Sequence, residues 1–355
     1  MSDFTRFRTW RRRSSVATMV AAAALTTLVV PGGSATAAAA HVGFSQVNLI
    51  SDVPGLAQVT DFRVSNPWGI TMGPTTPLWV NNDNTATSQI WAGANGTDPL
   101  SLKLTVQTPA FPTGIAFNST GKFAAKQNGT TVPTLFLFNG QDGYTSGWGP
   151  TANPPTMAIP TNFVRDNGYL GMAVASTKHG ARMYVASFAG VQVFNGVFQQ
   201  LNKPNAFIDP KVPAGLAPYN VAVINGRLFV TYADPAGGPG GAIAEFTLTG
   251  GFIRQLTANS HLNAPWGLAV APRHWGHFGT MLLVGNVNDG RISAFSRRTG
   301  AFRGQLRDSH GTVIANSGLW GLHFGNGVTG TPRDLLFAAG IDGYSHGLVG
   351  MIHPN

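Results

Sequence analysis

The stretch Ala264-Pro265-Trp266-Gly267-Leu268-Ala269-Val270 decides the fold, because the chain repeats its pattern six times. Each copy has a turn residue, an aromatic or small residue, a glycine position and then an apolar run. The glycine position falls at Gly69, Gly114, Gly171, Asn220, Gly267 and Gly321. The spacings are 45, 57, 49, 47 and 54 residues, and a four-stranded propeller blade takes about 40–50 residues. The sequence therefore predicts an all-β fold, a six-bladed β-propeller of four-stranded blades.

The fifth repeat shows the four strands of a blade most plainly. Strands are predicted over 265–271, 280–285, 291–295 and 302–306. The turn Asn288-Asp289-Gly290 suits a hairpin between the second and third strands, because Asp-Gly tolerates positive φ angles. The first strand is continuously apolar, as expected of a strand buried on both faces. The six blades are predicted to start near residues 66, 112, 169, 218, 265 and 319.

The last blade runs out of chain before its outer strand. The segment Phe44–Ile50 reads as a strand but has no blade of its own. We therefore predict that Phe44–Ile50 completes blade six and closes the ring, because closure removes the unpaired edges of an open sheet. The propeller domain is expected to span residues 41–355.

Residues 1–40 read as a secretory signal peptide. The run Arg11-Arg12-Arg13 precedes an apolar stretch from Val16 to Val30 and then small residues, with cleavage expected near Ala37–Ala40. The apolar stretch is shorter than the roughly 20 residues of a membrane span, so no membrane attachment is expected after cleavage. Paired arginines fit twin-arginine export, and the general secretory route is the alternative. The predicted location is extracellular or in the cell envelope.

Charge and cysteine content exclude several classes of function. The chain has a net charge of +9, and removal of residues 1–40, with five Arg and one Asp, leaves +5. Its basic residues are scattered, so nucleic-acid binding is not expected. The absence of cysteine removes disulfides, thiolate metal sites and cysteine nucleophiles. A monomer stabilised by its core is expected.

One face of the propeller should carry the functional site. In a propeller, the loops before the inner strands and the hairpins between the second and third strands open on the same face. The loops carry Trp68, Thr113, Tyr169, Tyr219, Trp266 and Trp320, and Asn220 follows at one strand start. The hairpins carry Asp83, Asp142, Asp234, Asp289 and Asp342. Aromatic rings beside carboxylates suit stacking on sugars or other rings, with hydrogen bonds to hydroxyl groups. Wedges between blades and turn formers are the structural alternatives.

Oxygen donors dominate the possible metal ligands. Asp83, Asn286, Asp289 and Asp342 are predicted on one face, and such donors would suit calcium. The full spacing of a calcium loop is missing, so turn formation is the alternative. His346 shares the last hairpin with Asp342, and the pair could act as a base and its orienting group or simply stabilise the turn.

Several motifs carry a family resemblance. They include Asn48-Leu49-Ile50-Ser51-Asp52, Asn66-Pro67-Trp68-Gly69-Ile70 and Gly318-Leu319-Trp320-Gly321-Leu322-His323-Phe324. The chain resembles exported bacterial six-bladed propeller proteins of unassigned activity, with repeats similar to NHL repeats. The resemblance implies a fold and an export route but no reaction. Gluconolactonase-like propellers offer a second comparison: they hold an axial divalent metal with Glu, Asn and Asp. Of that set this chain offers Asn220, and its first inner strand carries no Glu.

Three functions remain open from the sequence. The first is binding of a small molecule, a carbohydrate or a protein partner at the face described above. The second is a metal-assisted hydrolase or lactonase, or a lyase, acting on an extracellular sugar or lactone. The third is a scaffold that contacts another envelope protein.

Overall fold

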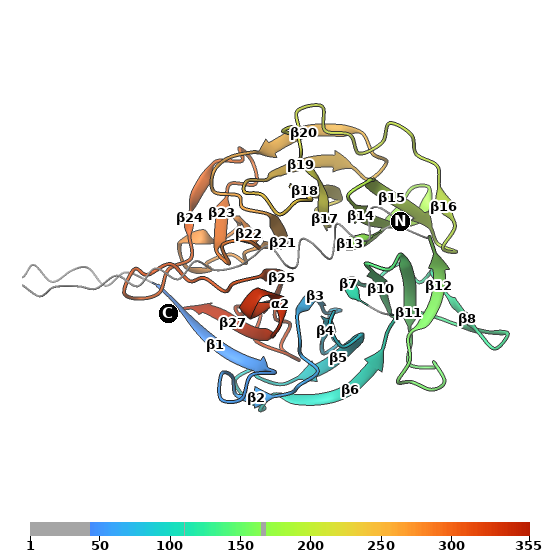
Figure 1. Ribbon diagram of the computed structural model, residues 1–355, viewed down its shortest axis with the longest axis horizontal. Coiled ribbons are helices and arrows are strands. Elements are labelled where there is room, and N and C mark those ends of the chain that lie inside the picture. The colour runs from blue at the N-terminus through green and yellow to red at the C-terminus, as the bar shows by residue number, and fades with distance from the viewer. Residues whose placement is uncertain (1–42, 110, 165–167) are drawn as a thin grey trace, which may run out of the picture.

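The computed structural model describes residues 43–109, 111–164 and 168–355, and it confirms the closed six-bladed propeller (Figure 1). The predicted signal peptide, 1–40, lies outside the described residues. Five of the blades are four-stranded sheets, and the sheet of the sixth blade has five strands. Strand bounds agree closely with those predicted for blade five, because the turns that flank these strands are encoded locally.

Each blade runs from an inner strand at the axis to an outer strand at the rim. Blade one comprises β3 (Pro67–Thr71), β4 (Leu78–Asn82), β5 (Thr87–Ala92) and β6 (Ser101–Gln107). Blade two comprises β7 (Pro112–Phe117), β10 (Phe136–Gly140), β11 (Tyr144–Trp148) and β12 (Ile159–Phe163). Blade three comprises β13 (Tyr169–Thr177), β14 (Gly180–Ser187), β15 (Gly190–Asn195) and β16 (Gln200–Leu201). Blade four comprises β17 (Ala217–Ile224), β18 (Arg227–Ala233), β19 (Ala242–Thr247) and β20 (Phe252–Thr257). Blade five comprises β21 (Pro265–Val270), β22 (Leu282–Asn286), β23 (Ile292–Phe295) and β24 (Phe302–Gln305). Blade six comprises β25 (Leu319–Phe324), β26 (Leu335–Ala339), β27 (Leu348–Pro354) and β1 (Phe44–Ser51).

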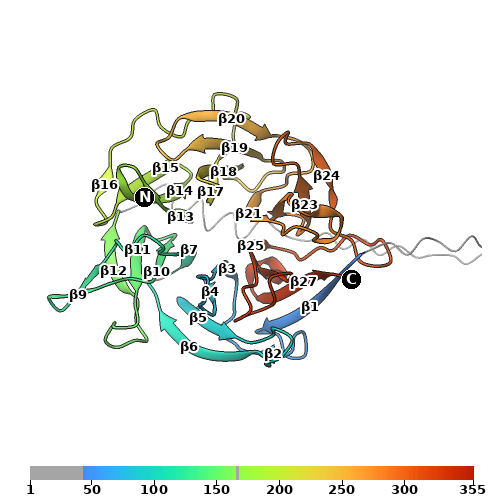
Figure 2. The same ribbon diagram turned by 180° about the vertical axis from the view of Figure 1, so that it is seen from behind.

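Three further elements depart from the regular blade. A hairpin of β8 (Ala125–Gln127) and β9 (Thr130–Val132) projects from blade two in both views (Figures 1 and 2). A 3-10 turn spans Gly276–Phe278, and the short helix α2 spans Ile341–Tyr344. Among the described residues, no helix has the length and apolar character needed to cross a membrane.

The N-terminal strand closes the ring as predicted. β1 pairs antiparallel with β27 from Phe44↔Pro354 to Ser51↔Leu348, and both views place the two strands side by side (Figures 1 and 2). The short strand β2 (Val59–Thr60) then pairs parallel with β1 and forms the outer edge of the sheet. Blade six is therefore built from both ends of the described chain.

Hydrophobic clusters hold neighbouring blades together. One cluster lies between each adjacent pair of blades, and a seventh lies where the inner strands converge. In the cluster between blades five and six, the buried ring of Phe44 lies 4.6 Å from the ring of Trp275 and 6.0 Å from that of Phe278. Closure by β1 therefore adds core contacts as well as hydrogen bonds.

Close approach of the inner strands explains the repeated glycine. Each inner strand contacts the next, and β25 returns to β3. A Cβ added at Gly114 would lie 2.7 Å from the carbonyl oxygen of Leu170, and one at Gly321 would lie 2.7 Å from that of Trp68. A Cβ at Gly69 or Gly267 would likewise collide with a carbonyl oxygen of the next blade. A side chain does not tolerate such contacts, so these four positions need glycine if the inner strands are to lie this close together.

Truncating Phe44 should destabilise the closed ring. Phe44→Ala removes a buried ring and is expected to lower the free energy of unfolding by about 3–5 kcal/mol. Phe62→Ala is the matched control, because the Phe62 side chain is 73% exposed. Urea unfolding followed by circular dichroism measures both. Equal stabilities of the two variants would contradict the structural role of β1.

Adding one methyl group at the axis should be costly. Gly321→Ala places a Cβ against the Trp68 carbonyl oxygen and is expected to cost about 1–3 kcal/mol, as overpacking does. Gly251→Ala is the control, since its nearest neighbour is the flexible Thr247 side chain, with Oγ1 at 3.2 Å. The same unfolding measurement applies. A Gly321→Ala protein as stable as wild type would show that the inner strands can move apart freely.

Candidate functional site

Five of the six residues immediately before the repeated glycine position meet in one buried cluster. Trp68, Leu170, Tyr219, Trp266 and Trp320 belong to a single buried cluster, which we call the axial cluster and which also contains Ala233, Ala264 and Val287. Phe188 and Tyr344 pack against it. Four of the predicted ligand-binding residues are thus brought together. In blade three the position belongs to Leu170, because Tyr169 turns into the core between blades two and three.

The three tryptophans fill the centre of this cluster. The rings of Trp68 and Trp320 stack with centroids 3.6 Å apart and an interplanar angle of 16°. Trp266 meets both rings edge-on, at 6.4 Å from Trp68 and 6.1 Å from Trp320. Trp68 is 2% exposed, Trp320 is 0% exposed and Trp266 is 5% exposed. They therefore pack as a plug of aromatic rings, and ligand binding by them stays a prediction.

Three polar atoms of the axial cluster have no hydrogen-bond partner among the described residues. They are Nε1 of Trp68, Nε1 of Trp266 and the hydroxyl oxygen of Tyr219. Trp320 differs, because its Nε1 donates to Oδ1 of Asn66 over 3.2 Å. Burial raises the pKa of Tyr219 well above its usual value, and the nearby Tyr344 adds to the shift. A buried donor without a partner is costly, so three in one cluster call for an explanation.

The other two predicted ligand-binding residues connect blades. The hydroxyl of Thr113 donates to the backbone oxygen of Tyr169 over 2.9 Å, which joins blade two to blade three. Nδ2 of Asn220 donates to the backbone oxygen of Trp266 over 2.7 Å, which joins blade four to blade five. Asn220 takes the glycine position of its blade, and its amide occupies the space beside Gly171. Both side chains already have partners within the ring.

The structure does not gather the four predicted metal ligands. Asp83 lies in blade one and accepts hydrogen bonds from Asn66 Nδ2 and Gln141 Nε2. Asn286 and Asp289 lie in blade five, where their Oδ1 atoms accept from the backbone nitrogens of Asn263 and Arg291, and Asp342 belongs to α2 in blade six. In the described ranges, no group of three or more His, Asp or Glu side chains is placed to hold a metal. Calcium at these residues stays a prediction.

Two hairpin carboxyl groups have altered acidity. Desolvation by burial raises the pKa of Asp142 in blade two, against a hydrogen bond from the backbone of Tyr144 that lowers it. Desolvation also raises the pKa of Asp289 in blade five, against the backbone hydrogen bond from Arg291. Each carboxylate accepts a local backbone hydrogen bond, as turn-forming aspartates do.

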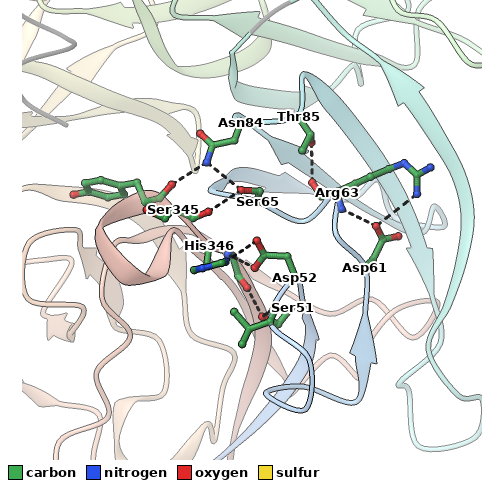
Figure 3. Close-up of polar contacts among 12 residues, drawn as sticks. Ser51, Asp52, Asp61, Arg63, Ser65, Asn84, Thr85, Ser345 and His346 are labelled. Carbon is green, nitrogen blue, oxygen red and sulfur yellow. Dashed lines mark hydrogen bonds and ion pairs between the residues drawn. The ribbon is translucent and has the colours of Figure 1, made fainter. Parts of the chain in front are cut away.

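The orienting partner of His346 is Asp52, which the sequence pattern did not indicate. Nδ1 of His346 lies 3.1 Å from Oδ2 of Asp52, and Oδ1 of Asp52 accepts from the backbone nitrogen of Gly347 over 2.8 Å (Figure 3). Ser51 adds a bond from its hydroxyl to the Gly347 carbonyl oxygen. The two partners are 294 residues apart in the chain. Only ring closure by β1 brings them together, so no local motif could reveal the pair.

Hydrogen bonds beside the His346–Asp52 pair hold the turn over 341–346 in place. The Asn84 amide donates to the backbone oxygen of Tyr344 over 2.9 Å, and the Ser65 hydroxyl donates to that of Ser345 over 3.1 Å (Figure 3). The ring of Tyr344 in turn lies 5.7 Å from that of Trp320. The turn therefore joins the surface of blade six to the axial cluster.

No protein-family model matches the chain. An uncharacterized protein of Acanthamoeba polyphaga mimivirus is 31% identical over 326 residues, which cover 86% of this chain and 78% of that protein. A second uncharacterized mimivirus protein is 30% identical over 326 residues, covering 86% and 84%. These relatives are viral, so they do not support the bacterial family that the motifs resemble.

Two solved structures share the architecture. Kuenenia stuttgartiensis hydrazine synthase matches with a TM-score of 0.50 and 13% identity, over 80% of this chain and 76% of that one. Virginiamycin B lyase from Staphylococcus aureus matches with a TM-score of 0.50 and 10% identity, over 88% and 99%. At these identities the likeness shows the fold alone. The sequence relatives are closer, and on their evidence the chain belongs to the same family as the two uncharacterized mimivirus proteins.

Proposed function

We propose that this protein is a binding protein whose ligand, a small molecule or a carbohydrate, contacts the axial cluster. Propellers commonly bind ligands. The observation that carries the proposal is the set of three buried polar atoms that lack partners in the described chain, Trp68 Nε1, Trp266 Nε1 and Tyr219 Oη. A ligand that accepts hydrogen bonds from them would offset their desolvation.

The composition of the axial cluster supports this choice. Aromatic rings at a binding site stack on the faces of sugars and other rings, and indole N–H groups add direction to the contact. The cluster spans blades one, three, four, five and six, so one ligand could contact several blades at once. Protein binding, a metal-assisted hydrolase, lactonase or lyase acting on a sugar or lactone, and a scaffold role are the alternatives.

Titration of the protein with a panel of glycans and ring-containing metabolites tests the proposal through intrinsic tryptophan fluorescence. A member of the panel should shift the emission, because the axial tryptophans would lose or gain contacts. Trp68→Phe should weaken binding about tenfold, which corresponds to one hydrogen bond of about 1.4 kcal/mol.

Trp91→Phe is the matched control. Trp91 is also buried with an Nε1 that finds no partner among the described residues, but it lies in the cluster between blades six and one. The Trp91→Phe variant should leave the affinity for the panel compound unchanged. A panel in which no compound shifts the emission, or equal losses in both variants, would contradict the proposal. Product formation during the titration would instead favour the enzyme.

We also propose that the chain is exported and released as a mature monomer. The support is the sequence of residues 1–40, with Arg11-Arg12-Arg13 before the apolar stretch. N-terminal sequencing of the extracellular protein should find a start near residue 38–41. Replacing Arg12 and Arg13 with Lys should block a twin-arginine route but not a general secretory one. Recovery of only the intact chain, starting at Met1, from the cytosol would rule out the signal peptide.

A further inference from the structure

The three polar atoms of the axial cluster that lack partners in the described chain can all donate a hydrogen bond. An indole N–H can only donate a hydrogen bond, and a phenol that keeps its proton donates as well. Burial keeps Tyr219 protonated, since its pKa lies well above the usual value. All three side chains can therefore donate, and a ligand that offers only donors would leave the indole N–H groups of Trp68 and Trp266 unsatisfied.

The side chains that form the axial cluster around these donors are apolar or aromatic. The axial cluster consists of Trp, Tyr, Leu, Ala and Val side chains, with Phe188 and Tyr344 packed against it. A carboxylate or an ammonium group moved into such surroundings loses its hydration, and for an anion the buried Asp83 carboxylate, which accepts from the Asn66 partner of Trp320, adds repulsion. The pKa of the ligand group would shift toward the neutral form, or binding would fail. The cluster thus selects against charged ligands.

The shape of the cluster is equally restrictive. Trp68 and Trp320 lie parallel, with Trp266 edge-on to both. A flat ring can replace or extend a ring-to-ring contact of this kind, since aromatic rings prefer stacked or edge-to-face arrangements. A bulky branched ligand would have to separate the inner strands, which the glycine contacts hold at a fixed spacing.

We infer that the axial cluster takes an uncharged, flat, ring-bearing compound whose carbonyl or ether oxygens accept hydrogen bonds from Trp68 Nε1, Trp266 Nε1 and Tyr219 Oη. The inference rests on the proposed function and adds the chemical class of ligand. Compounds with an oxygen acceptor on a planar ring, such as aromatic lactones, cyclic imides and quinones, meet all three requirements.

Four probes of similar size separate the requirements. Coumarin is flat and uncharged and carries a lactone carbonyl, naphthalene lacks the acceptor, 2-naphthoate adds a negative charge and 2-naphthylmethylamine adds a positive one. Saturation-transfer NMR gives the affinity of each for the full mature protein. Coumarin should bind about tenfold more tightly than naphthalene, as one hydrogen bond provides, and the two ions should bind more weakly than coumarin.

Tyr219→Phe tests the donor with little change in shape. It should weaken coumarin about fivefold to tenfold and leave naphthalene unchanged. Without ligand the variant should melt at or above the wild-type temperature, because it removes a buried hydroxyl that has no partner among the described residues. Tyr232→Phe is the control: its hydroxyl is buried in the same condition, but it lies between blades three and four. It should not alter coumarin binding.

The outcomes distinguish this inference from the proposed function. Equal or tighter binding of 2-naphthoate or the amine, lost in Trp68→Phe, would overturn the ligand class and leave axial binding in place. Coumarin binding that Tyr219→Phe does not weaken would overturn the role of the donors. If no probe binds, the ligand class is wrong, while the glycan and metabolite panel still decides the proposed function.

Discussion

The six inner strands approach one another around the axis so closely that at four positions backbone meets backbone with no room for a Cβ. Gly69, Gly114, Gly267 and Gly321 each face a backbone carbonyl of the next blade. In blade four the constraint is met differently: Asn220 fills the space beside Gly171 and bonds to the Trp266 carbonyl oxygen. The register of the inner strands depends on these contacts, and the placement of the axial residues depends on the register.

A tight ring leaves little room along its axis, and aromatic side chains fill it. Trp68, Tyr219, Trp266 and Trp320 each directly precede the glycine position of their blade. The ring geometry therefore brings these side chains together at the axis. The aromatic faces of Trp68, Trp266 and Trp320 pack against one another, but their packing does not give every N–H group on the ring edges a hydrogen-bond acceptor. Trp320 finds Asn66, whereas Trp68 and Trp266 find no acceptor within the described chain. The same geometry that stabilises the ring thus concentrates donors at its centre.

The repeat pattern predicts blade number, strand order and ring closure, because these follow from spacing and local turn chemistry. It also identifies Trp68, Tyr219, Trp266 and Trp320 as neighbours. It cannot show that they stack into a plug, since ring packing depends on three-dimensional register. Nor can the repeat pattern show that Leu170, and not Tyr169, enters the axial cluster in blade three, because a shift of one residue along a strand moves a side chain to the other face. The pairing of His346 with Asp52 spans the whole chain and leaves no local signal.

Closure of blade six has a consequence for the way the chain folds. β1 pairs with β27, so Phe44 near the start of the propeller pairs with Pro354 in the last strand of the ring. Loop closure over such a separation is slow, because chain entropy opposes contacts between distant residues. During synthesis β1 is made first, yet it stays without its antiparallel partner until β27 has been made. The closed ring therefore forms only after β27 has been translated, and a chain that lacks β27 would leave an unpaired strand edge available for aggregation.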